Sequence, residues 1–166
     1  MAVREILQYP DPSLKRASAP VTVFDATLRA LLQDLEDTMR AFPGSVGVSA
    51  PQIGESVRAV IVDLSAKPDI PQHGCLRLVN PEIVGREGEV KGREGCMSVP
   101  HFTGNVWRAA SIQLRAQDEE GQWHEWDCQG YEARALQHEL DHLDGVLFLD
   151  RVVSARHDLF RRKTYR

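Results

Sequence analysis

The sequence lacks any apolar run long enough to cross a membrane, and its first residues lack both the long apolar core of a signal peptide and the acid-free, arginine-rich character of a transit peptide. Cysteine is scarce as well. Three widely spaced residues do not make a disulfide framework, and they leave at least one thiol free for other chemistry: Cys75, Cys96 and Cys128. We therefore expect a cytoplasmic protein with no membrane partner.

An excess of positive charge is also absent, because the formal net charge is −4. No basic field of the kind that collects phosphates is present, so we expect no specific nucleic-acid partner. A hydrophobic content of 42% with 27% charged residues is ordinary for a globular chain, and 166 residues suit one domain with a single core. We expect a monomer formed by a single domain over residues 1–166, without repeats or linkers.

The hydrophobic pattern predicts two helices and several short strands. Prolines break residues 3–20 into an extended arm, and apolar residues at helical spacing over 24–42 predict a helix with Asp25 as its N-cap and Pro43-Gly44 as its end. The remaining segments are predicted as strands at 57–64, 76–79 and 82–84, with a turn at Asn80-Pro81, and as a hairpin of 112–117 with 123–128. This pattern predicts an α+β fold with mostly antiparallel strands around a central helix and a second, N-terminal helix.

The central helix is expected at about 131–144 and contains a His-Glu-x-x-His sequence. At about 100° per residue, His138 and His142 lie about 40° apart, and Glu139 lies within about 100° of both. The opposite face has an apolar stripe, and Gly145 suits a left-handed helix end. Two imidazoles one turn apart can bind a metal ion, and the carboxylate can take a proton from water. The alternative is a buried amphipathic helix with two ordinary histidines.

A third metal ligand would distinguish these alternatives. In two zinc-protease arrangements it lies downstream, but Phe148 occupies one of those places and no glutamate follows Glu139. Cys96 has the best claim, because it is a soft anionic donor in a glycine-flanked segment, and it would leave the fourth position for water. The other candidates are Asp144, Asp150, His157 and Asp158 downstream, with the cysteines and histidines upstream. Among these, His73 and Cys75 are more simply explained as a surface histidine and a packed thiol.

Three motifs in order carry a family resemblance: Gly47-Val48-Ser49-Ala50-Pro51-Gln52, Glu94-Gly95-Cys96-Met97-Ser98 and Gln137-His138-Glu139-Leu140-Asp141-His142. Together they resemble the peptide deformylases. The resemblance implies hydrolysis of the N-formyl group from the N-terminal methionine of newly synthesised polypeptides, with release of formate. It also implies one Fe²⁺ ion per chain, with Zn²⁺, Ni²⁺ or Co²⁺ as substitutes, held by Cys96, His138 and His142. Ligand chemistry alone would favour zinc.

The resemblance assigns catalytic roles to three residues. A metal-bound water attacks the formyl carbon, and Glu139 acts as general base and then as general acid. The side-chain amide of Gln52 and the backbone N–H of Met97 stabilise the oxyanion together with the metal.

It also implies substrate-binding residues. The peptide is expected to add as a strand beside Ser45, Val46 and Gly47, with the methionine side chain in a pocket near Val46, Met97, Ala135 and His138. Gly95 lets the backbone approach, Glu94 orients the chain around the cysteine, and Arg108 faces the substrate.

Departures from the family pattern affect the pocket rather than the chemistry. Ser45 stands where glycine is common and restricts the backbone there, Val48-Ser49 replace Leu-Ala, and Met97 replaces leucine. The basic segment 154–166 is expected to be a solvated, partly frayed tail, with transient contact to ribosomal RNA as the alternative. Two other functions stay open: a metallopeptidase that uses the same helix, and a metal- or peptide-binding protein without turnover.

Overall fold

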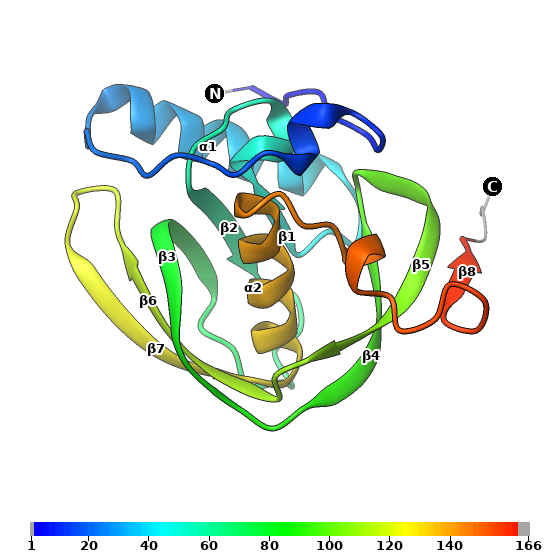
Figure 1. Ribbon diagram of the computed structural model, residues 1–166. Coiled ribbons are helices and arrows are strands. Elements are labelled where there is room, and N and C mark those ends of the chain that lie inside the picture. Colours follow the sequence, from blue (N-terminus) through cyan, green and yellow to red (C-terminus); the bar gives the residue numbers. More distant parts are fainter. Residues whose placement is uncertain (1, 163–166) are drawn as a thin grey trace.

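The computed structural model describes residues 2–162, and in this part of the chain eight strands form two antiparallel sheets (Figure 1). The larger sheet has the order β1-β2-β3-β6-β7 and the smaller has the order β4-β5-β8. The strands are β1 (Gly47–Ser49), β2 (Ala59–Asp63), β3 (Cys75–Glu87), β4 (Val90–Cys96), β5 (Val99–Arg108), β6 (Ser111–Gln117), β7 (Trp123–Gln129) and β8 (Leu159–Arg161).

Two α-helices and three short 3₁₀-helices complete the fold. The helices are α1 (Ala26–Ala41), α2 (Gly130–Leu143), η1 (Pro12–Lys15), η2 (Ala50–Ile53) and η3 (Phe148–Arg151). Figure 1 shows α2 in the centre, with the five-stranded sheet on one side and β4 and β5 on the other. Within residues 2–162, the helices are too short or too polar to cross a membrane.

Strand β2 is buried on both faces and separates two parts of the core. Successive side chains of a strand point to opposite faces. Val60 and Val62 therefore pack with the apolar face of α2, whereas Ala59 and Ile61 pack with α1. The apolar stripe of α2 is buried as predicted: Ala133, Leu136, Leu140 and Leu143. Burial of this stripe turns the opposite face of α2 towards the smaller sheet.

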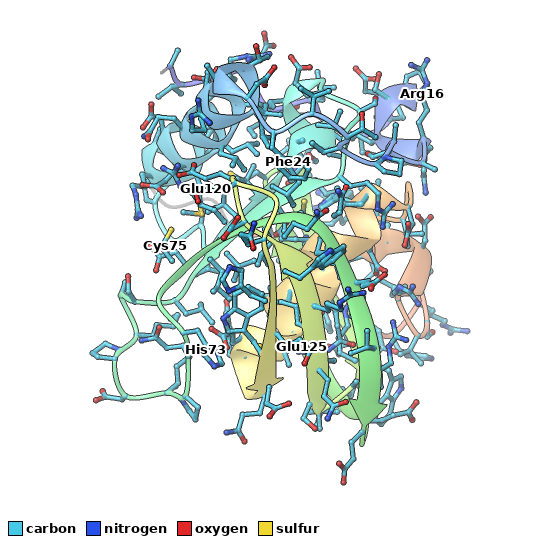
Figure 2. All side chains as sticks on the ribbon, turned by 90° about the vertical axis from the view of Figure 1, so that its left-hand side faces the viewer. Arg16, Phe24, His73, Cys75, Glu120 and Glu125 are labelled. Atoms are coloured by element: carbon cyan, nitrogen blue, oxygen red, sulfur yellow. The ribbon has the colours of Figure 1, made fainter. Side chains whose placement is uncertain are left out.

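The predicted helices and hairpin are confirmed, and so is the α+β architecture. Asp25 caps α1 by accepting a hydrogen bond from the backbone N–H of Leu28, and Gly145 adopts a left-handed φ of 73° just after α2. The predicted hairpin is formed by β6 and β7. Its tip, at Glu120, lies beside Phe24 at the start of α1 (Figure 2), and Gly121 faces the ring of Phe24.

The predicted turn at Asn80-Pro81 is wrong. Strand β3 continues through both residues, and the register to β6 shifts between Val79 and Glu82. Asn80 absorbs the irregularity, because it takes a φ of 50° that asparagine tolerates, and its side-chain amide bonds the backbone N–H and C=O of Val21 and the side chain of Gln117. A bulge thus replaces the turn. The local sequence could not predict it, because the hydrogen bonds that stabilise Asn80 come from segments distant in sequence.

The predicted frayed tail is wrong for the part that the structure describes. Residues Leu159–Arg161 form β8, which pairs with β5 at Phe102–Gly104, and the N–H of Arg162 donates to the carbonyl of His101. The strand has only three residues, which explains why hydrophobic patterning did not reveal it. Lys163 and Arg166 of the expected basic tail lie outside the described residues.

Gly145 supports a stability prediction, because a Cβ at this position would lie 2.5 Å from the backbone oxygen of Lys15 in η1. Gly145→Ala is expected to lower the free energy of unfolding by more than the roughly 1–2 kcal/mol that a left-handed alanine costs. Gly74→Ala is the matched control, since Gly74 has a similar φ of 75° with open space around it. Urea unfolding measures both, and equal losses would show that contact with η1 is unimportant.

Candidate metal centre and active site

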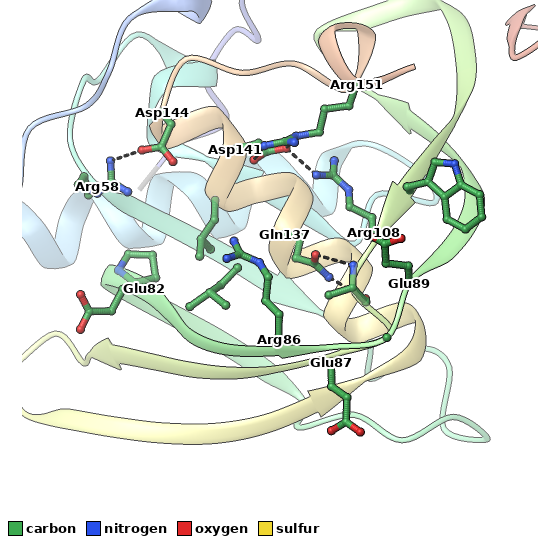
Figure 3. A pocket seen from close by; sticks show the side chains of 16 residues that line it. Arg58, Glu82, Arg86, Glu87, Glu89, Arg108, Gln137, Asp141, Asp144 and Arg151 are labelled. Carbon is green, nitrogen blue, oxygen red and sulfur yellow. Dashed lines mark hydrogen bonds and ion pairs between the residues drawn. The ribbon is translucent and has the colours of Figure 1, made fainter. Parts of the chain in front are cut away.

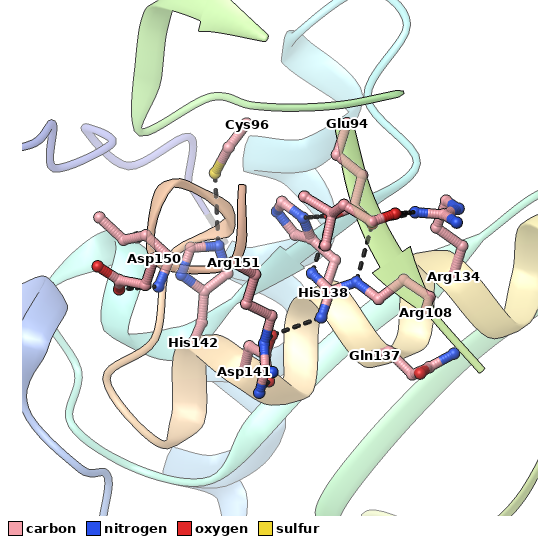
Figure 4. Close-up of polar contacts among 12 residues, drawn as sticks. Glu94, Cys96, Arg108, Arg134, Gln137, His138, Asp141, His142, Asp150 and Arg151 are labelled. Carbon is pink, nitrogen blue, oxygen red and sulfur yellow. Dashed lines mark hydrogen bonds and ion pairs between the residues drawn. The ribbon is translucent and has the colours of Figure 1, made fainter. Parts of the chain in front are cut away.

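The structure brings Cys96, His138 and His142 together (Figure 4). Cys96 ends β4, and the two histidines lie one turn apart on α2. All three residues are buried, and their potential ligand atoms lie within 4.8 Å of one another. The Sγ of Cys96 is 3.4 Å from the Nε2 of His142. Three donors from two distant segments therefore converge on one point.

This donor set fits a single metal ion. Tetrahedral bonds of about 2.3 Å to sulfur and about 2.0–2.1 Å to nitrogen separate the two donors by roughly 3.6 Å, close to the distance between Cys96 and His142. The acidic alternatives have other partners: Asp144 pairs with Arg58, Asp150 with Lys15 and Asp158 with Lys91. Of the candidate third ligands, Cys96 is the one that joins both histidines.

Glu94 organises the surroundings of His138. Its carboxylate accepts two hydrogen bonds of 2.8 Å from Arg108, one of 2.7 Å from Arg134 and one of 2.8 Å from the Nδ1 of His138. The last bond fixes the imidazole tautomer and directs Nε2 away from Glu94. Burial alone would raise the pKa of Glu94, but hydrogen bonds from Arg108 and His138 hold this pKa well below its usual range.

Glu139 lies between the donor cluster and β1. A Cβ at Gly47 would lie 2.7 Å from the Oε2 of Glu139, so glycine is required for this close approach. Within residues 2–162, the buried Oε1 of Glu139 has no hydrogen-bond partner. Burial raises the pKa of Glu139 to about 7, and the nearby charge of Glu94 acts in the same direction. A carboxylate with this pKa can accept and release a proton at neutral pH.

A groove of about 560 Å³ opens onto the donor cluster. It is lined by most of the predicted site residues: Ser45, Val46, Gly47, Gln52, Glu94, Gly95, Cys96, Met97, Ala135, His138 and Glu139. One wall contains Ser45, Val46 and Gly47, and Gly47 begins β1, which is an edge strand that pairs with β2 alone in the described part of the chain. The left-handed φ of 80° belongs to Gly44, so the backbone of Ser45 does not need the conformational freedom of glycine. The hydroxyl of Ser45 instead donates to the carbonyl of Gly47 at 3.3 Å.

Gln52 is held in one orientation by its neighbours. Its Oε1 accepts hydrogen bonds from the backbone N–H and the hydroxyl of Ser49, at 3.0 and 3.1 Å. Its Nε2 lies 3.0 Å from the hydroxyl of Ser98 and 3.4 Å from the Sγ of Cys96. The amide N–H groups therefore face the donor cluster.

Arg108 lies behind Glu94 instead of in this groove. Its buried guanidinium pairs with Glu94 and Asp141, and it lines a second cavity of about 480 Å³ on another side of α2 (Figure 3). That cavity has charged walls whose side chains pair with one another, as Arg58 does with Asp144 and Arg151 with Asp141. Its lining contains no cysteine or histidine among the described residues.

His73 and Cys75 lie apart from the donor cluster (Figure 2). The buried Glu132 accepts hydrogen bonds from the backbone N–H of His73 at 2.7 Å and from its Nδ1 at 2.6 Å. Cys128 lies nearby, but burial raises the pKa of its thiol to about 12, so the thiol stays protonated. These contacts anchor the loop before β3 to the first turn of α2.

Sequence reasoning missed Arg134, which donates to Glu94 and to the carbonyls of Val90 and Val106. A signal was available, because Arg134 precedes His138 by four residues and so shares its helix face. It also missed two exposed arginines in the groove wall, Arg93 and Arg162. Arg162 gave no signal, because its position depends on the unexpected strand β8.

The fold and the site define an α+β protein with a His-Glu-x-x-His helix beside an open groove of about 560 Å³. A family model described as polypeptide deformylase matches residues 3–158. The peptide deformylase of Acidobacterium capsulatum is 44% identical over 98% of this chain and 94% of its own length, and that of Symbiobacterium thermophilum is 45% identical over 94% and 70%. The crystal structure of the Thermotoga maritima peptide deformylase matches with a TM-score of 0.85 and 34% identity, over 93% of this chain and 100% of that chain. The chain therefore belongs to the peptide deformylase family and is an enzyme of that family.

The Glu94 network gives a second stability prediction. Glu94→Gln is expected to lower the free energy of unfolding of the metal-free protein by about 3 kcal/mol, because it leaves the buried Arg108 without its bidentate partner. Glu82→Gln, which removes an exposed pair with Arg115, should cost no more than about 1 kcal/mol. Chemical denaturation of both variants tests this, and equal effects would contradict a structural role for the network.

Proposed function

We propose that this enzyme is a metal-dependent hydrolase that removes the N-formyl group from the N-terminal methionine of newly synthesised polypeptides in the cytoplasm. The observation that carries the proposal is the convergence of Cys96, His138 and His142 beside Glu139, at the end of a groove with an open strand edge. A structure of the Acinetobacter baumannii peptide deformylase with Met-Ala-Ser bound supports it, since that chain matches this one with a TM-score of 0.84 and 34% identity over 91% of this chain and 99% of the other.

Cys96, His138 and His142 would hold one metal ion, which we propose to be Fe²⁺, with Zn²⁺, Ni²⁺ or Co²⁺ able to replace it. Such an ion lowers the pKa of a water molecule and polarises a carbonyl group. Glu94 keeps His138 in the tautomer that presents Nε2 to the ion, and Arg108 keeps Glu94 in place. Glu94 and Arg108 thus act as positioning residues.

Glu139 moves the proton. Its carboxylate takes a proton from the attacking water as the water oxygen bonds to the formyl carbon. When the bond between that carbon and the amide nitrogen breaks, Glu139 returns the proton to the departing amine. The products are formate and a free amino terminus. Burial suits this role, because it brings the pKa of Glu139 to about 7.

Gln52 and Met97 stabilise the developing oxyanion. Ser49 holds the oxygen of the Gln52 side chain, so the amide N–H groups face the reaction centre. The backbone N–H of Met97, next to Cys96, is the second donor. Because such donors act on charge that appears in the transition state, each is worth about 2.7–4 kcal/mol of barrier.

The peptide binds as an added strand beside residues 45–47, which line the groove and lead into the edge strand β1. Backbone hydrogen bonds recognise any sequence, which suits an enzyme that acts on many nascent chains. The methionine side chain enters the apolar part of the groove between Val46, Met97 and Ala135. Gly95 lies in the other wall, beneath the guanidinium of Arg162, so the peptide meets Arg162 where it crosses this glycine.

Replacement of the base tests the mechanism. Glu139→Ala is expected to retain bound metal but to lower kcat for formate release from a formyl-Met peptide by at least about 10²-fold, because the proton acceptor is lost. Enzymatic formate determination and metal analysis on anaerobically purified protein measure the two effects. Full activity of this variant would refute the assigned base. Release of an internal peptide amine without formate would identify a metallopeptidase instead.

Removal of the thiolate tests the ligand set. Cys96→Ala is expected to lower the metal content from about one ion per chain to near zero, because two histidines alone hold the ion weakly. Cys75→Ala is the control, since Cys75 is exposed and lies outside the donor cluster. Metal analysis after desalting measures both variants. Undiminished metal in Cys96→Ala would place the third ligand elsewhere.

A further inference from the structure

Two exposed arginines lie on one face of the smaller sheet, in the wall of the active-site groove. Arg93 belongs to β4, and Arg162 directly follows β8. Between them, Phe160 of β8 is paired with Thr103 of β5. Side chains alternate along a strand, so Phe160 and Arg162 share this face, whereas Arg161 points to the other. A strand from the middle of the chain and one near its C-terminus thus place two guanidinium groups at the same part of the groove.

Their side chains reach towards the path of the peptide. The guanidinium of Arg93 stacks on the ring of Phe160, at 3.7 Å from the ring centre. The Nη2 of Arg162 lies 2.6 Å from the place that a Cβ of Gly95 would occupy, so it covers this glycine. Gly95 adjoins the ligand Cys96. A peptide that crosses Gly95 would therefore meet both cations.

The positive charge of these two side chains is not balanced within the described chain. The other charges in the groove wall belong to Glu94, Arg134, His138 and Glu139, and Glu94 is already engaged by Arg108 and Arg134. Within residues 2–162, neither Arg93 nor Arg162 takes part in an ion pair. A cationic rim is notable in a protein whose formal net charge is −4.

We propose that Arg93 and Arg162 form a subsite for a carboxylate side chain of the substrate, within the first residues after the formyl-methionine. The proposal rests on the proposed function, since it assumes that a formyl peptide occupies the groove. Guanidinium groups present paired donors that match the geometry of a carboxylate. Aspartate and glutamate are the anionic side chains of a nascent peptide, so the enzyme should process formyl-Met peptides with an acidic second or third residue faster than those with a basic one.

Formyl tripeptide amides test this preference without interference from a terminal carboxylate. The holoenzyme is assayed with formyl-Met-X-Ala-amide and formyl-Met-Ala-X-amide, in which X is Glu, Gln or Lys. In at least one series, kcat/KM for Glu is expected to exceed that for Lys by about threefold to tenfold at low salt, as for a partly exposed ion pair. The ratio should fall towards one in 1 M salt, where charges are screened within about 3 Å.

Variants assign the preference to these residues. Arg162→Glu is expected to invert the Glu-to-Lys ratio, and Arg93→Ala to reduce it. Arg161→Ala is the matched control, because it removes the same charge from the adjacent residue on the other face and should leave the ratio unchanged. Equal kcat/KM for Glu and Lys in both series of the wild-type enzyme would overturn the subsite, as would a preference that persists in Arg162→Glu. Absence of formate from every peptide, the Gln peptides included, would instead contradict the proposed function.

Discussion

The bidentate pair between Glu94 and Arg108 is the interaction on which the geometry of the site depends. It joins β4 to β5, and through His138, Arg134 and Asp141 it joins both strands to α2. The ligands of the donor cluster come from the same two bodies, Cys96 from β4 and the histidines from α2. Any shift of the smaller sheet against α2 would change the distance between thiol and imidazoles, so this pair fixes the geometry of the donor cluster.

A second constraint comes from close backbone approach at two ends of the site. Gly47 lets β1 lie against the carboxylate of Glu139, and Gly145 lets the chain after α2 pass under η1. A side chain at either position would push an element away from α2. Packing thus sets the position of Glu139 relative to the groove, while the charged network sets that of the donor cluster.

The sequence predicts those parts of the molecule whose signals are local. The helix containing His138 and His142, the capped helix after Asp25 and the hairpin 112–117/123–128 follow from periodicity and end residues. The proximity of Cys96 to the two histidines had to be inferred from elimination and donor chemistry, because Cys96 lies far from the helix in sequence. What could not be predicted depends on distant contacts: Asn80 continues a strand because Val21 and Gln117 satisfy its side chain, and Arg162 reaches the groove because β8 pairs with β5. The resemblance implied that Arg108 faces the substrate, and no local signal predicted its burial between Glu94 and Asp141.

Burial of so many charges beside the donor cluster needs a physical reason other than stability. Removing Glu94 and Arg108 from water is costly, and well-packed apolar residues in their place would often give an equally stable or more stable protein. Apolar residues, however, could not accept a hydrogen bond from the Nδ1 of His138 or fix its tautomer. They would also remove the only carboxylate that Arg134 contacts in the described chain, and leave it with the carbonyls of Val90 and Val106. The network therefore offsets part of its desolvation cost through its own hydrogen bonds. Its main effect is orientation, because Glu94, itself held by Arg108 and Arg134, keeps the Nε2 of His138 directed at the donor cluster.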